Sequence, residues 1–518
     1  MESNIAQRMD RLSAKTANRV VLLVPAALVV YLYLNLFAFS GTPFLLNGDQ
    51  VYFWLYGQRM IHGERAYLDF FQFLPPGIDL VFFAAFKALG ARVWVTNLVV
   101  LVLGAALSLV CFRLASRIMD RPRALLATAL FVSLVYGRLL NATHHWFSVL
   151  LILSAVAVAM ERRTPVRIGL AGGLLGLASF FTQTHGVAAA GALAVFLVWE
   201  CVEERASWRS LLTKEAALAL GFCAALAAAT APYLVAVGPR ALWDLQFNFV
   251  RKFMVQAVGT PWFGLPEAPT WRRLPAIAPY FLVYGVLAFT YPAVLVACWR
   301  GRRRAAPGEG NRAVLLGLVG LFLLVEVLFS PNWLRLYCIA MPAVILFIWW
   351  LARTRAAGPA LSLLWIAAVG LALGQTWSRQ SQNTTIGDFR GGRVATPRQA
   401  YLKLRWISDH TAPHEFFYQA PWPGLYIPLD LRNPAYLDAV SLVQAVRPDD
   451  LTRTIRELDA KQVRYVLWSP VLDRSDPSWG SMQLAPLREY LHARYACVYT
   501  FPDLDQIWQR RLESGVRN

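Results

Sequence analysis

Long apolar runs separated by short polar segments occupy most of the chain. The first run extends from Val20 to Phe39, and the last from Leu361 to Leu373. A helix needs roughly 20 apolar residues to cross the hydrocarbon core of a membrane, and many of the runs approach this length. The pattern therefore predicts a polytopic α-helical membrane protein with about eleven transmembrane helices.

Basic residues collect in every second connection between these runs. Examples are the arginines Arg117, Arg121 and Arg123 after the run from Val93 to Leu114, and the basic segment 299–312. Cytoplasmic connections carry such an excess of arginine and lysine, so the N-terminus and these turns are expected in the cytoplasm. The two long outer loops, 40–92 and 238–275, then face the other side. An odd number of spans sends the C-terminus there as well.

Composition supports the membrane class and excludes others. Hydrophobic residues make up 57% of the 518 residues, charged residues only 16%, and the mean hydropathy is +0.44, unlike soluble globular proteins. The net charge of +19 is divided among the turns and forms no single stripe, so no nucleic-acid partner is expected. The 6 cysteines are too scattered for a CxxC metal site or a disulfide framework. Without a GxxxxGK[ST] or HExxH motif, and without a DxD-type acid pair in the outer loops, neither a metal nor another cofactor is expected.

The composition becomes polar from Trp377 onward, where short apolar runs alternate with helical patterns. Strands are expected at Phe416–Gln419, Arg464–Trp468 and Ala496–Phe501. One apolar helical face is formed by Leu451, Ile455 and Leu458, and it follows two acids suited to a helix N-terminus, Asp449 and Asp450. A second such face is formed by Leu484, Leu487 and Leu491. This alternation predicts a small C-terminal α/β domain outside the membrane. The predicted domains are therefore 1–376 and 377–518.

The first outer loop is rich in polar and aromatic residues. The stretch from Asn47 to Gly77 holds two acids, Asp49 and Asp69, several aromatic residues and a Pro-Pro-Gly turn. An acid just after a span lies at the depth of a lipid headgroup, where a carboxylate can accept a proton from an acceptor hydroxyl. Asp49 is therefore a candidate base. An acid that caps the helix beginning near Val51 would give the same pattern.

Asp69 lies between aromatic residues of the same loop. Burial among them would raise its pKa and suit it to acid–base catalysis. A structural pairing with Arg59 or Arg65 explains its position equally well. The next apolar segment, Ile78 to Leu89, is too short to span a membrane and predicts an interfacial helix.

Two stretches resemble the GT-C glycosyltransferases, in particular the group of protein O-mannosyltransferases and aminoarabinose transferases. They are HGERAYLDFFQFLPPG in the first outer loop and PNWLRLYCIAMPAV at the start of a late span. The order of cytoplasmic N-terminus, many spans and outer C-terminal α/β domain is similar too. The resemblance implies transfer of a sugar from a polyprenyl-phosphate carrier to a glycan, lipid or protein acceptor, on the outer face of a bacterial inner membrane.

The resemblance also implies roles for particular residues. Asp49 would act as the base toward the acceptor or as the charge that orients it, with Asp69 as the second catalytic candidate. Arg335 would hold the carrier phosphate, for which a guanidinium is suited, and Tyr337 of the same motif is a further substrate-binding candidate.

The chain departs from the family pattern at three places. Gln50 stands where many members have a second acid, and Leu74 where related sugar-lipid transferases have a lysine. In the second outer turn, where an acid often occurs, this chain has Asn141, His144 and His145. The histidines are candidate acceptor-side groups, and simple solvation at the membrane interface is the alternative.

Further polar residues near the outer ends of the spans are candidate substrate-binding residues. They are Tyr52 and Arg59 in the first loop, Gln183 and His185 in the turn TQTHG, and Arg251 and Lys252 beside the amphipathic stretch formed by Leu242, Leu245, Phe249 and Phe253. A capped helix end would also account for the turn, and anchoring of the loop for the amphipathic stretch. Glu326, an acid inside a span, is either a site residue or one that snorkels to the interface.

Two other function classes fit the same pattern. A transporter or flippase of lipid-linked saccharides would also have many spans, but the related halves and deep charges typical of transporters are not evident. The third class is a noncatalytic membrane scaffold whose C-terminal domain binds a partner. Membrane lipids are expected partners in every case.

Overall fold

The computed structural model describes residues 24–254, 274–301, 309–328, 333–440, 446–473 and 481–511. The chain divides into two compact units: unit 1 comprises Met1–Leu36, Val100–Thr230 and Thr260–Gln380, and unit 2 comprises Phe37–Val99, Ala231–Gly259 and Ser381–Asn518. The basic residues expected before the first span, and residues 255–273 of the second outer loop, lie outside the described residues.

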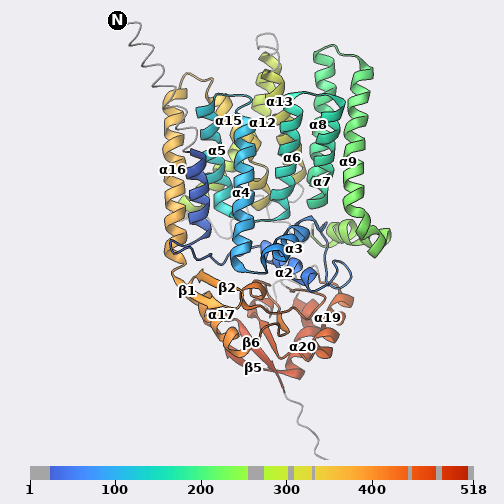
Figure 1. Ribbon diagram of the computed structural model, residues 1–518, viewed down its shortest axis with the longest axis vertical. Coiled ribbons are helices and arrows are strands. Elements are labelled where there is room, and N and C mark those ends of the chain that lie inside the picture. The colour runs from blue at the N-terminus through green and yellow to red at the C-terminus, as the bar shows by residue number, and fades with distance from the viewer. Residues whose placement is uncertain are drawn as a thin grey trace, which may run out of the picture. The chain divides into compact units, whose positions relative to one another are not determined.

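Unit 1 is built almost entirely of helices that run side by side (Figure 1). Its helices are Val24–Leu36, the C-terminal part of α4 (Val93–Ala115), α5 (Arg121–Leu130) with the π-helical η1 (Phe131–Tyr136), α6 (His144–Glu161), α7 (Pro165–Phe181), α8 (Gln183–Glu203), most of α9 (Trp208–Val237), α12 (Leu274–Gly301), α13 (Glu309–Val327), α14 (Trp333–Cys338), α15 (Met341–Leu351) and α16 (Ala357–Gln382).

Among the described residues, 7 helices are long and apolar enough to cross a membrane. Four further apolar helices of 10–17 residues were found there: Val24–Leu36, Pro165–Phe181, Gly285–Arg300 and Met341–Leu351. The predicted helical membrane class is therefore supported, and the number eleven stays a prediction.

Small residues allow two of these helices to approach closely. A Cβ atom at Gly172 of α7 would lie 2.3 Å from the carbonyl oxygen of Leu218 in α9, and one at Gly221 would lie 2.1 Å from the oxygen of Gly169. Packing of glycine faces is a common way for membrane helices to associate. It fixes α7, whose C-terminal end leads into the turn TQTHG.

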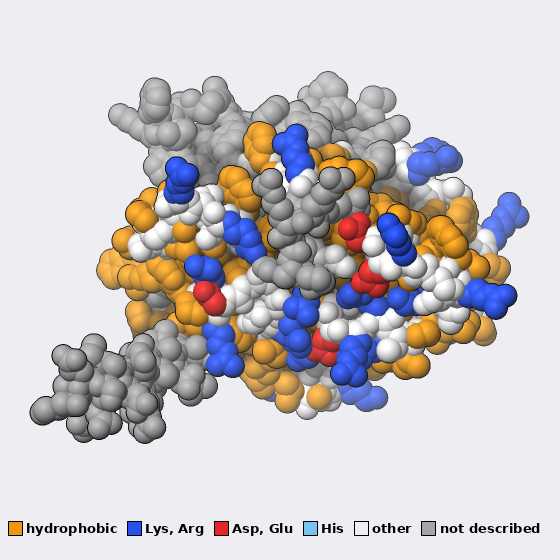
Figure 2. Space-filling view, turned by 90° about the horizontal axis from the view of Figure 1, so that it is seen from above, with side chains coloured by type: hydrophobic (Ala, Val, Ile, Leu, Met, Phe, Trp, Pro, Cys, Tyr) orange, Lys and Arg blue, Asp and Glu red, His pale blue; other side chains and the backbone are white. Residues whose placement is uncertain are grey.

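One end of unit 1 carries a network of ion pairs. Glu161, at the end of α6, accepts hydrogen bonds from Arg113 and Arg117 at 2.6 Å and from Arg167 at 2.7 Å. Arg312 of α13 donates to the carbonyl oxygen of Arg117 at 2.9 Å. The arginine-rich turns predicted to share one side of the membrane therefore do share one end of unit 1. Figure 2 looks onto the upper ends of the helices in Figure 1 and shows Lys and Arg side chains interspersed with a few acids.

Unit 2 contains two β-sheets. β1 (Thr385–Phe389) and β2 (Gly392–Thr396) form an antiparallel pair, and β3 (Phe417–Gln419), β4 (Tyr465–Trp468), β6 (Gln506–Arg510) and β5 (Tyr495–Thr500) follow in that order across the second sheet. β3 and β4 are parallel, whereas β6 is antiparallel to both of its neighbours. The three predicted strands are confirmed to within a residue at each end, and β1, β2 and β6 were not predicted.

The helices of unit 2 are α2 (Gln50–Ile61), α3 (Gly77–Leu89), the N-terminal part of α4, α10 (Pro239–Trp243), η3 (Asp244–Asn248), η4 (Val250–Met254), α17 (Arg398–His410), α18 (Tyr426–Leu429), α19 (Pro448–Ala460) and α20 (Ala485–Arg494). α3 confirms the short helix that the sequence predicted after the Pro-Pro-Gly turn. In α19 and α20 the predicted leucines are buried, and Asp449 and Asp450 occupy the first turn of α19.

The first outer loop is part of unit 2. Leu45 donates its backbone N–H to the oxygen of Ala395 at 3.0 Å, and Phe71 donates to the oxygen of Tyr436 at 2.9 Å. Leu55 of α2 lies in one hydrophobic core with Phe417 and other residues of the C-terminal segment. The units therefore differ from the predicted division at residue 376, because the loop packs into the core that the C-terminal segment forms.

Candidate functional site

Asp49 lies at the start of α2 with an exposed side chain. It occupies the N-cap position, but its backbone is α-helical (φ −53°, ψ −23°) and its carboxylate makes no capping hydrogen bond. A side-chain cap needs an extended backbone that turns the carboxylate toward the free N–H groups. The capping interpretation of Asp49 is therefore wrong.

An aromatic pair lies next to this acid within unit 2. The rings of Tyr52 and Trp422 meet edge to face, with centroids 5.1 Å apart and an interplanar angle of 80°. The indole Nε1 of Trp422 is buried and has no hydrogen-bond partner among the described residues. Both side chains are half-buried, and Tyr52 lies one turn after Asp49 in α2. Trp422 lies in the C-terminal segment, far from the loop in sequence, and sequence reasoning did not identify it.

Gln50 has a structural role. Its side chain is fully buried, and its Nε2 donates to the backbone oxygen of Asn47 at 2.9 Å. The amide closes the turn that leads into α2. A second carboxylate at this position would be buried next to a carbonyl oxygen, which is unfavourable. The local geometry thus explains why this chain tolerates an amide where the family pattern often has an acid.

Asp69 does not have the buried environment that the sequence suggested. Its side chain is 37% exposed, and its Oδ2 accepts hydrogen bonds from the backbone N–H of Arg65 at 2.8 Å and from its Nε at 3.3 Å. The expectation of burial among aromatic residues is wrong, because the chain turns back on Arg65. The alternative interpretation, a structural acid paired with Arg65, fits these contacts.

Arg59 is buried and uses its whole guanidinium inside unit 2. Nε donates to Glu64 at 2.7 Å, Nη1 to the oxygen of Ala435 at 2.7 Å and to Asp438, and Nη2 to the oxygen of Asp69 at 3.0 Å, with Glu64 2.6 Å away. A guanidinium has five N–H groups, and these contacts occupy them. Arg59 therefore ties the first loop to the C-terminal segment and is not placed to bind substrate.

Asp79, in the short helix α3, is a buried acid that sequence reasoning did not single out as a site residue. Its side chain is fully buried, and its Oδ2 accepts a hydrogen bond from Nε2 of Gln72 at 2.7 Å. Its Oδ1 has no hydrogen-bond partner among the described residues. Burial raises the pKa of Asp79 to about 8, although the hydrogen bond from Gln72 opposes this rise. Asp79 is therefore mostly protonated at neutral pH and supports the Pro-Pro-Gly turn.

A cluster of three histidines occupies one end of unit 1. The ring centroids of His144 and His145 are 3.9 Å apart, and those of His145 and His185 are 5.1 Å apart. Nδ1 of His144 lies 2.9 Å from Oγ1 of Thr182, and Nδ1 of His185 lies 2.9 Å from Oγ of Ser148. Because His145 is only 6% exposed, the alternative of simple solvation is wrong for this residue, whereas His144 is half-buried. His185 is only 1% exposed.

Glu326 joins this cluster from α13. Its Oε1 accepts a hydrogen bond from Thr184, and its Oε2 lies 3.3 Å from Nε2 of His185. The side chain is 20% exposed. Since both oxygens face partners within unit 1, Glu326 belongs to the histidine cluster. Thr182, the N-cap of α8, makes no side-chain capping hydrogen bond, so helix capping does not account for the turn TQTHG.

Arg335 and Tyr337 lie on the short helix α14. Tyr337 is fully buried, and Arg335 is half-buried. The guanidinium of Arg335 is close enough to act electrostatically on the rings of His144, His145 and His185. The structure therefore brings Arg335 together with three of the predicted binding residues within unit 1. Gln183 lies in the same turn as His185.

Arg251 and Lys252 are exposed at the end of η4, whereas Leu242, Leu245 and Phe249 of the preceding turns are buried. For the residues whose side chains are described, the amphipathic character of this stretch is confirmed. The stretch is also tied to the C-terminal segment of unit 2, because Asp244 lies 3.4 Å from Arg447.

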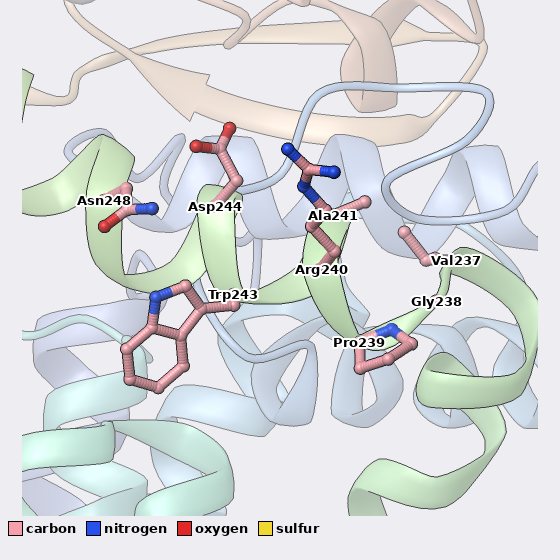
Figure 3. A pocket seen from close by; sticks show the side chains of 8 residues that line it. All are labelled: Val237, Gly238, Pro239, Arg240, Ala241, Trp243, Asp244 and Asn248. Carbon is pink, nitrogen blue, oxygen red and sulfur yellow. The ribbon is translucent and has the colours of Figure 1, made fainter.

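A hollow of about 740 Å³ borders this stretch. Its lining residues run from Val237 to Asn248. Figure 3 shows Trp243 and Asp244 leaving opposite sides of one helical segment, so their side chains do not converge. Among the described residues, no group of three or more His, Cys, Asp or Glu side chains is arranged to hold a metal ion.

Comparison with solved structures identifies the fold as that of the GT-C membrane glycosyltransferases. No protein-family model and no curated protein matches the sequence. ArnT from Cupriavidus metallidurans, bound to undecaprenyl phosphate, is similar with a TM-score of 0.63 at 13% identity, covering 96% of this chain and 99% of that one. The oligosaccharyltransferase of Archaeoglobus fulgidus gives 0.53 at 13% identity, covering 96% of this chain and 74% of that one.

A further structure, the archaeal oligosaccharyltransferase AglB from Archaeoglobus fulgidus in complex with an inhibitory peptide and a dolichol-phosphate, gives a TM-score of 0.51 at 14% identity. It covers 98% of this chain and 75% of that one. At such low identity the likeness establishes the fold and not the individual site residues.

Proposed function

We propose that this protein is a membrane glycosyltransferase that moves a sugar from a polyprenyl-phosphate carrier to an acceptor on the outer face of a bacterial inner membrane. The observation that carries the proposal is the GT-C fold over 96% of the chain. Two of the similar proteins were solved with a polyprenyl-type phosphate bound, undecaprenyl phosphate in one and dolichol-phosphate in the other.

Asp49 acts as the base toward the acceptor or as the charge that orients it. Its exposed carboxylate, not used for capping, supports this role. The half-exposed rings of Tyr52 and Trp422 beside it suit the apolar face of a sugar, since aromatic rings offer a flat contact surface. Asp69 is a poorer candidate for the base, because its carboxylate is already bound to Arg65.

Arg335 binds the carrier phosphate. A guanidinium offers paired donors that match phosphate oxygens. Its position beside the histidine cluster, and the buried hydroxyl group of Tyr337 on the same helix, support this assignment. Arg251 and Lys252, exposed at the end of an amphipathic stretch, contact lipid headgroups or the carrier.

The test offers the purified full-length protein a panel of undecaprenyl-phosphate hexoses and pentoses and measures both released undecaprenyl phosphate and sugar covalently attached to acceptor. Asp49→Asn is expected to lower the transfer rate by about 10²–10⁴-fold, because a base is lost while the side-chain shape is kept. Asp69→Asn is expected to change the rate by less than about threefold.

Asp388→Asn provides the matched control, since Asp388 is an exposed acid paired with Arg393 at 3.2 Å in the same unit. Full activity of Asp49→Asn would remove the assignment of the base, and a large loss in Asp69→Asn would transfer it to Asp69. Movement of the carrier across the membrane without covalent transfer of sugar would decide for a flippase.

A further inference from the structure

Several buried polar atoms around the histidine cluster of unit 1 have no hydrogen-bond partner in the described part of the chain. They are Oδ1 of Asn141, Oγ1 of Thr143, Nδ1 of His145 and Nε2 of Gln183. Thr143 is fully buried and His145 is 6% exposed. Leaving a buried polar group unpaired costs about 1–3 kcal/mol, so four of them in two neighbouring turns indicate that something else pairs with them.

The frame that holds these atoms is rigid. Ser148 donates its hydroxyl proton to the carbonyl oxygen of His145 at 2.8 Å, so its oxygen accepts from Nδ1 of His185 at 2.9 Å. Nε2 of His185 then faces Glu326 at 3.3 Å.

The unpaired atoms are of both hydrogen-bonding kinds. Nε2 of Gln183 can only donate and Oδ1 of Asn141 can only accept, whereas the hydroxyl of Thr143 can do either. Ionised phosphate oxygens only accept hydrogen bonds, so they cannot satisfy Asn141. Sugar hydroxyls both donate and accept, and they can satisfy the whole set.

We propose that Asn141, Thr143, His145 and Gln183 bind the hydroxyl groups of the donor sugar, while Arg335 beside them binds the phosphate. The inference rests on the proposed function, because it takes the donor to be a sugar linked to polyprenyl phosphate. It assigns recognition of the hydroxyl groups of the donor sugar to unit 1. Ser148, His185 and Glu326 are positioning residues, which hold the ring of His145 through the frame described above.

Thr143→Val is the most informative variant. Valine has nearly the same shape as threonine and removes only the unpaired hydroxyl, and Thr143 makes no side-chain cap for α6. The variant is therefore expected to fold with unchanged or raised thermal stability. Gln183→Leu removes the unpaired donor in the same way. Each is expected to raise KM for the undecaprenyl-phosphate sugar that the protein uses best by about tenfold.

The affinity for undecaprenyl phosphate without a sugar is the second measurement. It is expected to stay within about twofold of the starting value in both variants, because the phosphate contacts are untouched. Thr128→Val is the matched control, since Thr128 is equally buried but donates to the oxygen of Ala124 at 2.8 Å inside α5. It is expected to change neither KM nor the affinity for the bare carrier.

Three results would overturn the inference, and they can be told apart. An equal loss for both carriers would mean that the cluster binds phosphate. No change for either carrier would mean that the unpaired atoms hold ordered water only. If the starting protein binds neither undecaprenyl phosphate nor any of its sugar derivatives, the proposed function itself fails.

Discussion

The polar side chains at the two ends of unit 1 differ in whether they have hydrogen-bond partners within the fold. At the arginine-rich end, Glu161 accepts from three arginines at 2.6–2.7 Å. At the other end, two buried polar atoms have no hydrogen-bond partner in the described residues. They are Nδ1 of His145 and the hydroxyl oxygen of the neighbouring Thr143. The first arrangement stabilises the helix ends, and the second leaves binding capacity unused.

This difference indicates where stability and function lie in unit 1. Charges that are matched within the fold contribute to stability and have nothing left for a ligand. Unmatched buried polar groups lower stability, and a fold keeps them where a ligand repays the cost. Substitutions at the arginine-rich end should therefore lower stability without changing binding, and substitutions of the unpaired groups at the histidine end should weaken binding without lowering stability.

Glu200→Gln is expected to have the largest effect on stability. Glu200 is 3% exposed, forms an ion pair with Arg163 and lies 3.7 Å from Lys214. Removing its charge leaves two cations close together, so the free energy of unfolding should fall by about 3 kcal/mol. The measurement is thermal unfolding of the purified protein in detergent, together with kcat/KM for sugar transfer.

Glu204→Gln is the matched control, because Glu204 lies one turn further on and is exposed. It should change stability by less than about 0.5 kcal/mol. A loss of transfer in Glu200→Gln at temperatures where the protein stays folded would contradict the separation of the two ends.

Arg335→Gln is expected to weaken the binding of undecaprenyl phosphate by about 30–100-fold, with or without a sugar attached, because a charge-assisted hydrogen bond to phosphate is lost. Arg312→Gln at the opposite end is the control, since that side chain donates only to a backbone oxygen at 2.9 Å. Equal losses in both variants would show that overall positive charge, and not the position of Arg335, determines carrier binding.

The sequence predicted the helices and strands of this fold better than it predicted which of them contact one another. The hydrophobic runs and helical faces locate the spans and α19 and α20, because burial along one face is a local pattern. β6 was missed because Gln506–Arg510 places polar residues next to Ile507 and Trp508, and only pairing with β4 and β5 makes the segment a strand. The attachment of the first loop to the C-terminal segment depends on contacts more than 300 residues apart in sequence, such as Phe71 with Tyr436.

The candidate site shows the same limit. His144, His145 and His185 could be named from their place near the outer ends of spans, and so could Arg335 from its motif. The contacts of Ser148 and Glu326 with His185 could not be predicted, because they form only when α6, α8 and α13 pack together. For Asp69 the sequence named Arg65 as a possible partner but could not choose this pairing over a catalytic role. Asp438, a partner of Arg59, lies 379 residues away in sequence and becomes known only with the folded loop.

Unit 2 repeats the contrast between matched and unmatched polar groups. The guanidinium of Arg59 has a partner for each donor, whereas the fully buried Asp79 has one oxygen without a hydrogen-bond partner in the described residues. Arg59 should therefore stabilise unit 2 through these contacts. Asp79 should make stability depend on pH.

Asp79→Asn is expected to have the smallest effect, and it should appear only as a difference between two pH values. Burial raises the pKa of Asp79 from 3.8 to about 8. Between these values the folded protein keeps a proton that the unfolded chain has lost, so stability falls as the pH rises toward 8. The asparagine variant has no such proton and should lose about 1–2 kcal/mol less than the starting protein between pH 6.5 and pH 8, measured by thermal unfolding. Asp388→Asn, at an exposed acid, should leave the pH dependence unchanged. Parallel stability curves for Asp79→Asn and the starting protein would show that Asp79 is ionised in the folded protein and that the contrast does not extend to unit 2.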